Sequence, residues 1–151
     1  MRQHLNIHQS FDDPSQRFFN AIGTDSYIRP HRHLLDPKAE DLIAIRGLFA
    51  MVAFKDDGEV CDVVRFGTEK YDGVAAGVEV APGTWHTVIA LTEGAVLLEL
   101  KGGPFVPTAA KEPAPWAPEE GTPEGRRYFA SLGKAVAGWR GKSGEESVLA
   151  A

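Results

Sequence analysis

Short apolar segments, separated by turns that contain glycine or aspartate, follow one another through the middle of the chain. Residues 48–54 are apolar throughout, and the next four, Lys55-Asp56-Asp57-Gly58, end in the Asp-Gly pair that favours a tight β-hairpin. Strands this short and this closely spaced indicate a sandwich or a barrel. We expect strands over residues 26–32, 40–46, 48–54, 59–66, 78–80, 85–91 and 95–101.

The two ends of the chain carry helix signals instead. Residues 13–22 begin with Asp13 as a possible cap, Pro14 at the first helical position and Gln16 where a capping box has Glu or Gln. Thr122-Pro123 can start a second helix near the C-terminus. One domain is expected, with an N-terminal strand and helix extension (1–25), a barrel (26–103), a proline-rich wrapping segment with the last helix (104–140) and a disordered tail (141–151).

Composition excludes several classes of partner. The net charge is −5, which argues against nucleic acid and against an anionic membrane, since both require a basic surface. Cys61 is the single cysteine, so no intramolecular disulfide can form. Residues 1–20 contain no apolar run of a signal peptide, and no stretch approaches the ~20 apolar residues of a membrane span. The expectation is a soluble cytoplasmic protein.

A group of histidines carries the clearest chemistry. In a strand, residues two apart point to the same face, so both imidazoles of His31-Arg32-His33 can reach one metal ion. Glu40 heads the next expected strand, and His86 follows a Pro-Gly turn. Separately, each has an ordinary explanation: a surface His-x-His pair, a strand-start carboxylate and a buried structural histidine. Together, three imidazoles and one carboxylate favour one divalent Zn, Fe, Ni, Co or Mn ion.

These residues resemble the two motifs of the cupin superfamily. The first is matched by His31-x-His33, Glu40 and Gly47, and the second by Pro82-Gly83-x-x-His86. The resemblance implies an all-β double-stranded β-helix (jelly-roll barrel), with short helices at the two ends of this chain, and makes the histidines and Glu40 metal ligands. Two departures stand out: Leu34-Leu35-Asp36-Pro37 widen the loop before Glu40, and Ala90 replaces the asparagine that ends the second motif.

Further motifs are similar to the WbuC family of cupin-fold metalloproteins. They lie in the runs Asn6–Asn20, Tyr27–His33, Leu98–Phe105 and Pro115–Gly121, which together span most of the chain. Members of that family are often encoded with bacterial surface-polysaccharide (O-antigen) genes. The resemblance therefore implies a role with a sugar or a sugar nucleotide.

Three side chains are candidates for catalysis beside the metal. If residues 27–33 form a regular strand, Tyr27 and Arg29 face inward with the histidines, Tyr27 as a proton donor and Arg29 as a clamp for an anion. Glu99 interrupts an apolar strand and is a candidate general base. Two of the three have an alternative: Arg29 can pair with a barrel carboxylate, and Glu99 can face solvent.

Three functions remain open at this point. The first is a metal-dependent enzyme acting on a sugar or sugar nucleotide, for example an isomerase or epimerase. The second is a non-catalytic, metal-stabilised module that binds a small carbohydrate or acid, and the third is an iron-dependent dioxygenase. A divalent ion with three neutral imidazoles and only one carboxylate has a net positive charge of about +1. In all three cases the site would therefore attract a small anionic ligand. A homodimer is expected as well, because the apolar strand over residues 48–54 needs a cover and because the resemblance to cupins, which frequently pair through their sheets, implies one.

Overall fold

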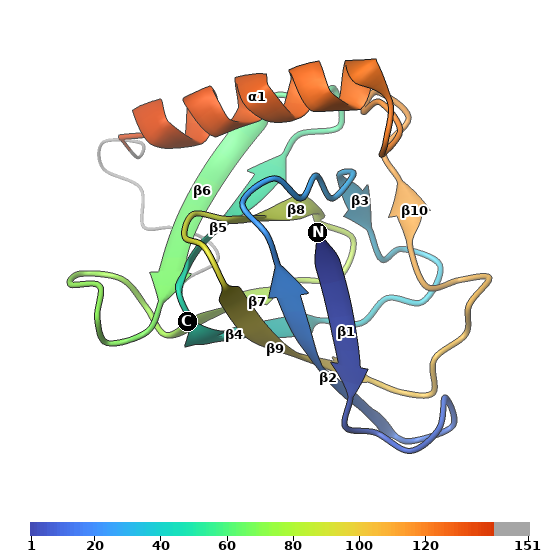
Figure 1. The fold of residues 1–151 in the computed structure, drawn as a ribbon. Helices are drawn as coiled ribbons and strands as arrows, with labels where there is room; N and C mark the ends of the chain where they lie inside the picture. Colours follow the sequence, from blue (N-terminus) through green and yellow to red (C-terminus); the bar gives the residue numbers. More distant parts are fainter. Residues whose placement is uncertain (141–151) are drawn as a thin grey trace.

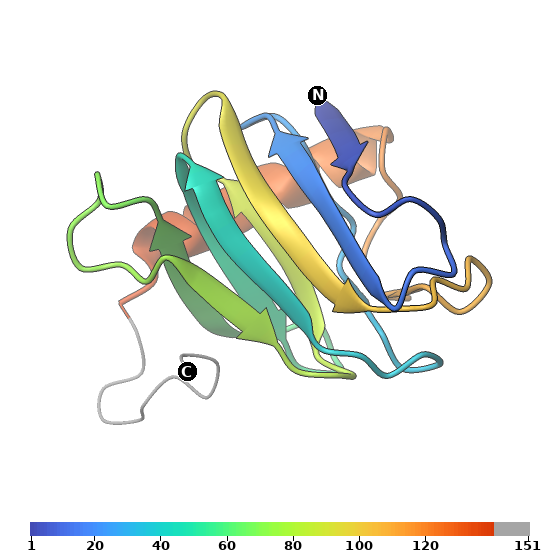
Figure 2. The same cartoon turned by 90° about the horizontal axis from the view of Figure 1, so that it is seen from below.

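Two five-stranded antiparallel sheets face each other in a flattened β-barrel, and one helix crosses the outside of the second sheet (Figure 1 and Figure 2). The structure is a computed structural model that describes residues 1–140. The predicted disordered tail, residues 141–151, lies outside this described part. The predicted all-β fold is confirmed.

The strand orders are β1-β2-β9-β4-β7 in the first sheet and β10-β3-β8-β5-β6 in the second. From β4 onward the chain crosses repeatedly between the sheets, as in a jelly roll. The elements are β1 (Arg2–Asn6), β2 (Ser15–Ile22), β3 (His31–Arg32), β4 (Glu40–Arg46), β5 (Leu48–Phe54), β6 (Val60–Gly67), β7 (Gly77–Val80), β8 (Trp85–Ala90), β9 (Ala95–Gly102), β10 (Glu112–Pro113) and α1 (Pro123–Gly138).

Strand β5 is apolar throughout because both of its faces are covered. Phe49 and Met51 point between the sheets, where the Phe49 ring stacks on Phe66 with centroids 5.2 Å apart. Val52 belongs to a second apolar cluster on the outer face, together with Leu132 of α1. Helix α1 therefore covers the outer face of β5, the surface that a second subunit was expected to cover. The homodimer stays a prediction, supported only by the resemblance to cupins.

Helix α1 begins as its sequence predicts. Thr122 is the N-cap, and its hydroxyl accepts a hydrogen bond from the Gly125 amide at 3.0 Å. Pro123 occupies the first turn, where its missing N–H costs no hydrogen bond. No helix within residues 1–140 is long and apolar enough to cross a membrane.

The predicted N-terminal helix over residues 13–22 is wrong, because Ser15–Ile22 form strand β2. All eight residues of β2 pair with β9, so long-range pairing outweighs the local capping signals. Asp13 caps a turn rather than a helix: its carboxylate accepts a hydrogen bond from the Ser15 amide at 3.0 Å. Together with β1, this strand makes residues 1–25 part of the first sheet.

The expected strand over residues 26–32 is also shorter than predicted. Only His31–Arg32 are paired, as β3, with β8 on one side and β10 on the other. Residues 26–30 are irregular and contact the segment between β10 and α1 through side chains. These contacts attach the proline-rich segment to residues 26–30.

Gln16 organises the loop between β1 and β2. Its buried side-chain amide donates to the carbonyl oxygens of Ser10 (3.3 Å), Phe11 (3.2 Å) and Asp13 (2.9 Å). We expect Gln16→Ala to lower the free energy of unfolding by about 1–3 kcal/mol, because these part-buried carbonyls lose their partner. Urea denaturation measures the change, with exposed Gln9→Ala as the control. Equal stabilities of the two variants would contradict this role.

Candidate metal centre

Four predicted ligands lie together at one end of the barrel. His31 of β3 pairs with His86 of β8 in the second sheet, and His33 follows directly after β3. Glu40 is the first residue of β4 in the facing sheet. One ligand atom from each residue lies within 4.8 Å of all the others, and His33, Glu40 and His86 are buried. The widened loop before Glu40 therefore still brings its carboxylate to the histidines.

Backbone carbonyl groups fix the orientation of the three imidazoles. The Nδ1 atoms donate from His31 to Arg29 (3.0 Å), from His86 to Thr84 (2.9 Å) and from His33 to Ala110. A carbonyl oxygen can only accept, so in each ring Nδ1 carries the hydrogen and the Nε2 lone pair is left free. This arrangement is typical of metal-binding histidines, whose second nitrogen is held by an outer partner.

Two of the free Nε2 atoms, those of His33 and His86, face the Glu40 carboxylate. Nε2 of His33 lies 2.9 Å from Oε1, and Nε2 of His86 lies 3.2 Å from Oε2. The buried Nε2 of His33 has no hydrogen bond of good geometry. Unprotonated nitrogens and carboxylate oxygens are all acceptors, so their proximity calls for a cation or a proton between them. The donor set fits a divalent metal, and an imidazolium–carboxylate pair is the competing arrangement.

Electrostatics sets the protonation state of two of the four side chains. Burial, with His86 next to it, holds the pKa of His31 well below its usual value, so this ring stays neutral at pH 7. Burial alone would raise the pKa of Glu40, but contacts with His33 and His86 outweigh it and hold that pKa well below normal. A neutral imidazole and an ionised carboxylate are the protonation states that metal ligands require.

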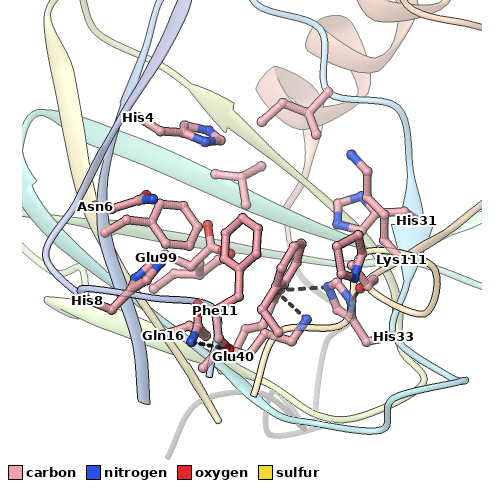
Figure 3. Close-up of a pocket in the computed structure, with 18 of the residues that line it drawn as sticks. His4, Asn6, His8, Phe11, Gln16, His31, His33, Glu40, Glu99 and Lys111 are labelled. Carbon is pink, nitrogen blue, oxygen red and sulfur yellow. Dashed lines mark hydrogen bonds and ion pairs between the residues drawn. The ribbon is translucent and has the colours of Figure 1, made fainter. Parts of the chain in front are cut away.

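The centre opens into a cavity of about 550 Å³ (Figure 3). Ile28, Leu42 and Val88 give it an apolar part, and Glu99 and Lys101 enter it from β9. Because these two residues are two apart, they share one face of the strand. The Lys101 ammonium donates to Glu40 Oε1 at 3.1 Å. Lys101 was missed by the sequence analysis, although its spacing from Glu99 was a usable signal.

Glu99 lines the cavity and lies next to Glu40. Burial, and then the charge of Glu40 and contact with it, raise the pKa of Glu99 well above its usual range. Glu99 therefore holds its proton to a higher pH than an ordinary carboxyl group does. Of the two alternatives for Glu99, the structure gives the one that faces the cavity.

Tyr27 and Arg29 do not line the cavity, contrary to expectation, whereas Ile28 does. The Tyr27 hydroxyl donates to the Pro118 carbonyl at 2.9 Å, and the Arg29 guanidinium donates to the Ala114 carbonyl at 2.9 Å. The inference from alternation fails because residues 26–30 are not a regular strand. Both side chains hold the wrapping segment instead.

Arg32, between His31 and His33 in the sequence, contacts the strands on both sides of β3. Its guanidinium donates from Nε and from a terminal nitrogen to the Glu112 carboxylate of β10, both at 3.0 Å. It also lies 4.2 Å above the ring of Trp85, the neighbour of His86 on β8. One side chain thus ties together the three adjacent strands that position all three imidazoles.

Comparisons with known sequences give one partial match. Residues 1–66 match the family model described as a domain of unknown function, DUF6016. A comparison with curated proteins finds no match. Sequence comparison therefore adds no activity to what the site geometry shows.

Solved structures with a similar fold are more informative. A protein from Shewanella oneidensis has a TM-score of 0.58 at 14% identity, over 73% of this chain and 72% of that one. A cupin 2 domain-containing protein from Halorhodospira halophila has a TM-score of 0.53 at 12% identity, over 94% and 85%. Oxalate decarboxylase from Bacillus subtilis has a TM-score of 0.54 at 16% identity, over 74% of this chain and 27% of that one. At these identities the likeness concerns the fold, and the chain has the jelly-roll fold of the cupins.

Proposed function

We propose that this protein binds one divalent metal ion through His31, His33, Glu40 and His86 and holds a small anionic ligand beside it. One observation carries the proposal: three Nδ1-anchored imidazoles and one ionised carboxylate converge within 4.8 Å in a buried site. Zn, Fe, Ni, Co and Mn all suit such a donor set. Among proteins of similar fold, oxalate decarboxylase from Bacillus subtilis has Mn(II) centres.

The charge of the site supports an anionic ligand. A divalent ion, three neutral imidazoles and the Glu40 carboxylate sum to a net charge of about +1. Lys101 adds a positive charge beside Glu40, and the raised pKa of Glu99 favours its uncharged form. When bound, the ion would act as a Lewis acid on an oxygen of the ligand.

The enzyme hypothesis depends on Glu99. Its carboxyl group is on the cavity wall beside Glu40, where it can hold a proton next to a bound ligand. Tyr27 and Arg29 lie outside the cavity, and we assign them no catalytic role. The resemblance to the WbuC family supports a sugar or sugar nucleotide of surface-polysaccharide synthesis as the substrate. A non-catalytic binding module uses the same site without proton transfer, and a dioxygenase requires iron.

Metal analysis of protein purified without added metal tests the proposal. We expect about one transition-metal ion per chain, and a melting temperature that falls when a chelator removes the ion and recovers when it is returned. Iron together with oxygen uptake would select the dioxygenase. Protein that neither retains nor rebinds any divalent ion would overturn the proposal.

Arg32 provides a separate test of the outer structure of the site. We expect Arg32→Leu to weaken Co²⁺ binding by up to about tenfold, less than the loss of a group bonded to a ligand, because Arg32 contacts Glu112 and Trp85 and acts only through the strands. A titration followed by the visible spectrum of Co²⁺ measures the affinity. Exposed Arg127 on α1 gives the control, Arg127→Leu. Unchanged Co²⁺ affinity in a folded Arg32 variant would show that Arg32 only stabilises the barrel.

A further inference from the structure

Strand β1 has its polarity reversed relative to an ordinary barrel strand. Alternate residues of a strand point to opposite faces. Here Arg2, His4 and Asn6 line the cavity from one face of this edge strand, where His4 and Asn6 stay accessible to solvent, and Leu5 on the other face is 66% exposed. A strand that merely closed an apolar core would place leucine inside and the polar side chains outside. The three polar residues therefore form an accessible wall of the cavity, which the polar groups of a ligand can contact.

The polar row, Arg2, His4 and Asn6, lies across the cavity from the metal centre. In Figure 3, His4 and Asn6 are on one side, His31 and Lys111 are on the other, and Glu99 lies between them. A ligand that binds at the metal and extends through the cavity therefore reaches β1. The row and the metal centre are parts of one continuous site.

The polar row is held in place before any ligand arrives. All five residues of β1 pair with β2, and Arg2 forms an ion pair with Glu120 at 3.2 Å. The His4 ring lies against Phe18, with centroids 5.1 Å apart. A preordered wall of this kind loses little conformational entropy on binding.

The side chains of the row identify the chemical group that would bind there. Burial, with Arg2 and Lys111 nearby, lowers the pKa of His4, so its ring is neutral at pH 7. A neutral imidazole and the amide of Asn6 each donate and accept hydrogen bonds, as hydroxyl groups do. Arg2 adds further donors. The row thus offers partners to hydroxyl groups, and Phe11, Phe18 and Phe105 supply an apolar wall against which the C–H faces of a hydroxylated chain can lie.

We infer that the polar row on β1 binds the hydroxylated tail of a polyhydroxy carboxylic acid whose carboxylate end is held at the metal centre. This inference rests on the proposed metal function and narrows its ligand class. Arg2, His4 and Asn6 would distinguish ligands by their hydroxylated tails. The metal centre would hold the carboxylate that these ligands share.

Two probes with the same chelating group separate the row from the metal centre. Glycolate has an α-hydroxy carboxylate and no tail, and D-gluconate has the same group with four further hydroxylated carbons. Binding to Co²⁺-loaded protein is followed by calorimetry, and the metal content is measured afterwards to show that neither acid has removed the ion. We expect gluconate to bind about tenfold more tightly than glycolate, which corresponds to one or two additional hydrogen bonds.

Variants of β1 complete the test. We expect His4→Leu and Asn6→Leu to reduce gluconate affinity to the level of glycolate while glycolate affinity stays unchanged. Gln3→Leu is the matched control, since Gln3 lies on the same strand and does not line the cavity. If gluconate binds no more tightly than glycolate, or if Gln3→Leu has the same effect as Asn6→Leu, the inference about the row is overturned and the metal function stands. Failure to bind Co²⁺ would instead overturn the metal function.

Discussion

His33→Ala is expected to reduce the affinity for a divalent metal by more than about 100-fold, so that the purified variant carries almost none. Loss of an outer partner alone typically costs 10–100-fold, and this change removes a ligand. It also removes the imidazole whose buried Nε2 lies 2.9 Å from Glu40 without a hydrogen bond. Inductively coupled plasma mass spectrometry measures the metal content, and a Co²⁺ titration measures the affinity.

His8→Asn is the matched control for this experiment. His8 is another buried histidine that lines the same cavity, but it bonds to the backbone of Arg17 and lies outside the four-residue cluster. We expect this variant to keep its metal. Far-UV circular dichroism establishes that both variants are folded. A folded His33→Ala protein with wild-type metal content would contradict the proposed ligand set.

Leu132→Ala is expected to lower the free energy of unfolding by about 2–5 kcal/mol, the usual cost of truncating a buried leucine. Leu132 is 4% exposed and lies in the apolar cluster between α1 and the outer face of β5 and β8. If α1 is the cover that β5 requires, a cavity at this point must weaken the whole barrel. Chemical denaturation gives the change in free energy.

Lys134→Ala gives the comparison for that prediction, because Lys134 is exposed on the same helix. We expect its effect to stay within about 0.5 kcal/mol. Similar small effects of the two variants would mean that α1 contributes little to the stability of the barrel. The outer face of β5 would then need another cover, and the predicted homodimer would regain its physical reason.

A strand could be predicted from the sequence where its own residues and the adjacent turn carry the signal. Residues 48–54 are apolar throughout and are followed by an Asp-Gly turn, and β5 has the predicted bounds. Residues 13–22 show the opposite case. Asp13, Pro14 and Gln16 fit the start of a helix, yet pairing of β2 with β9, about 80 residues away along the chain, decides the conformation. Such pairing leaves no local trace in the sequence.

The site residues also divide into those that a short stretch of sequence reveals and those whose position depends on the folded structure. His31, His33 and His86 were identifiable because their spacing and turn context depend on short stretches of chain. Tyr27 and Arg29 were misplaced because alternation holds only within a regular strand, and β3 begins at His31. The polar row on β1 escaped notice because the direction of its side chains depends on the register of β1 against β2.

A crystal structure of the metal-loaded protein, with anomalous diffraction recorded at the absorption edge of the bound metal, tests the central claim most directly. The account predicts one anomalous peak within bonding distance of Nε2 of His31, His33 and His86 and of the Glu40 carboxylate. A metal bound elsewhere would contradict it. So would a metal-free site at saturating metal concentration, in which protonated His33 and His86 pair with Glu40.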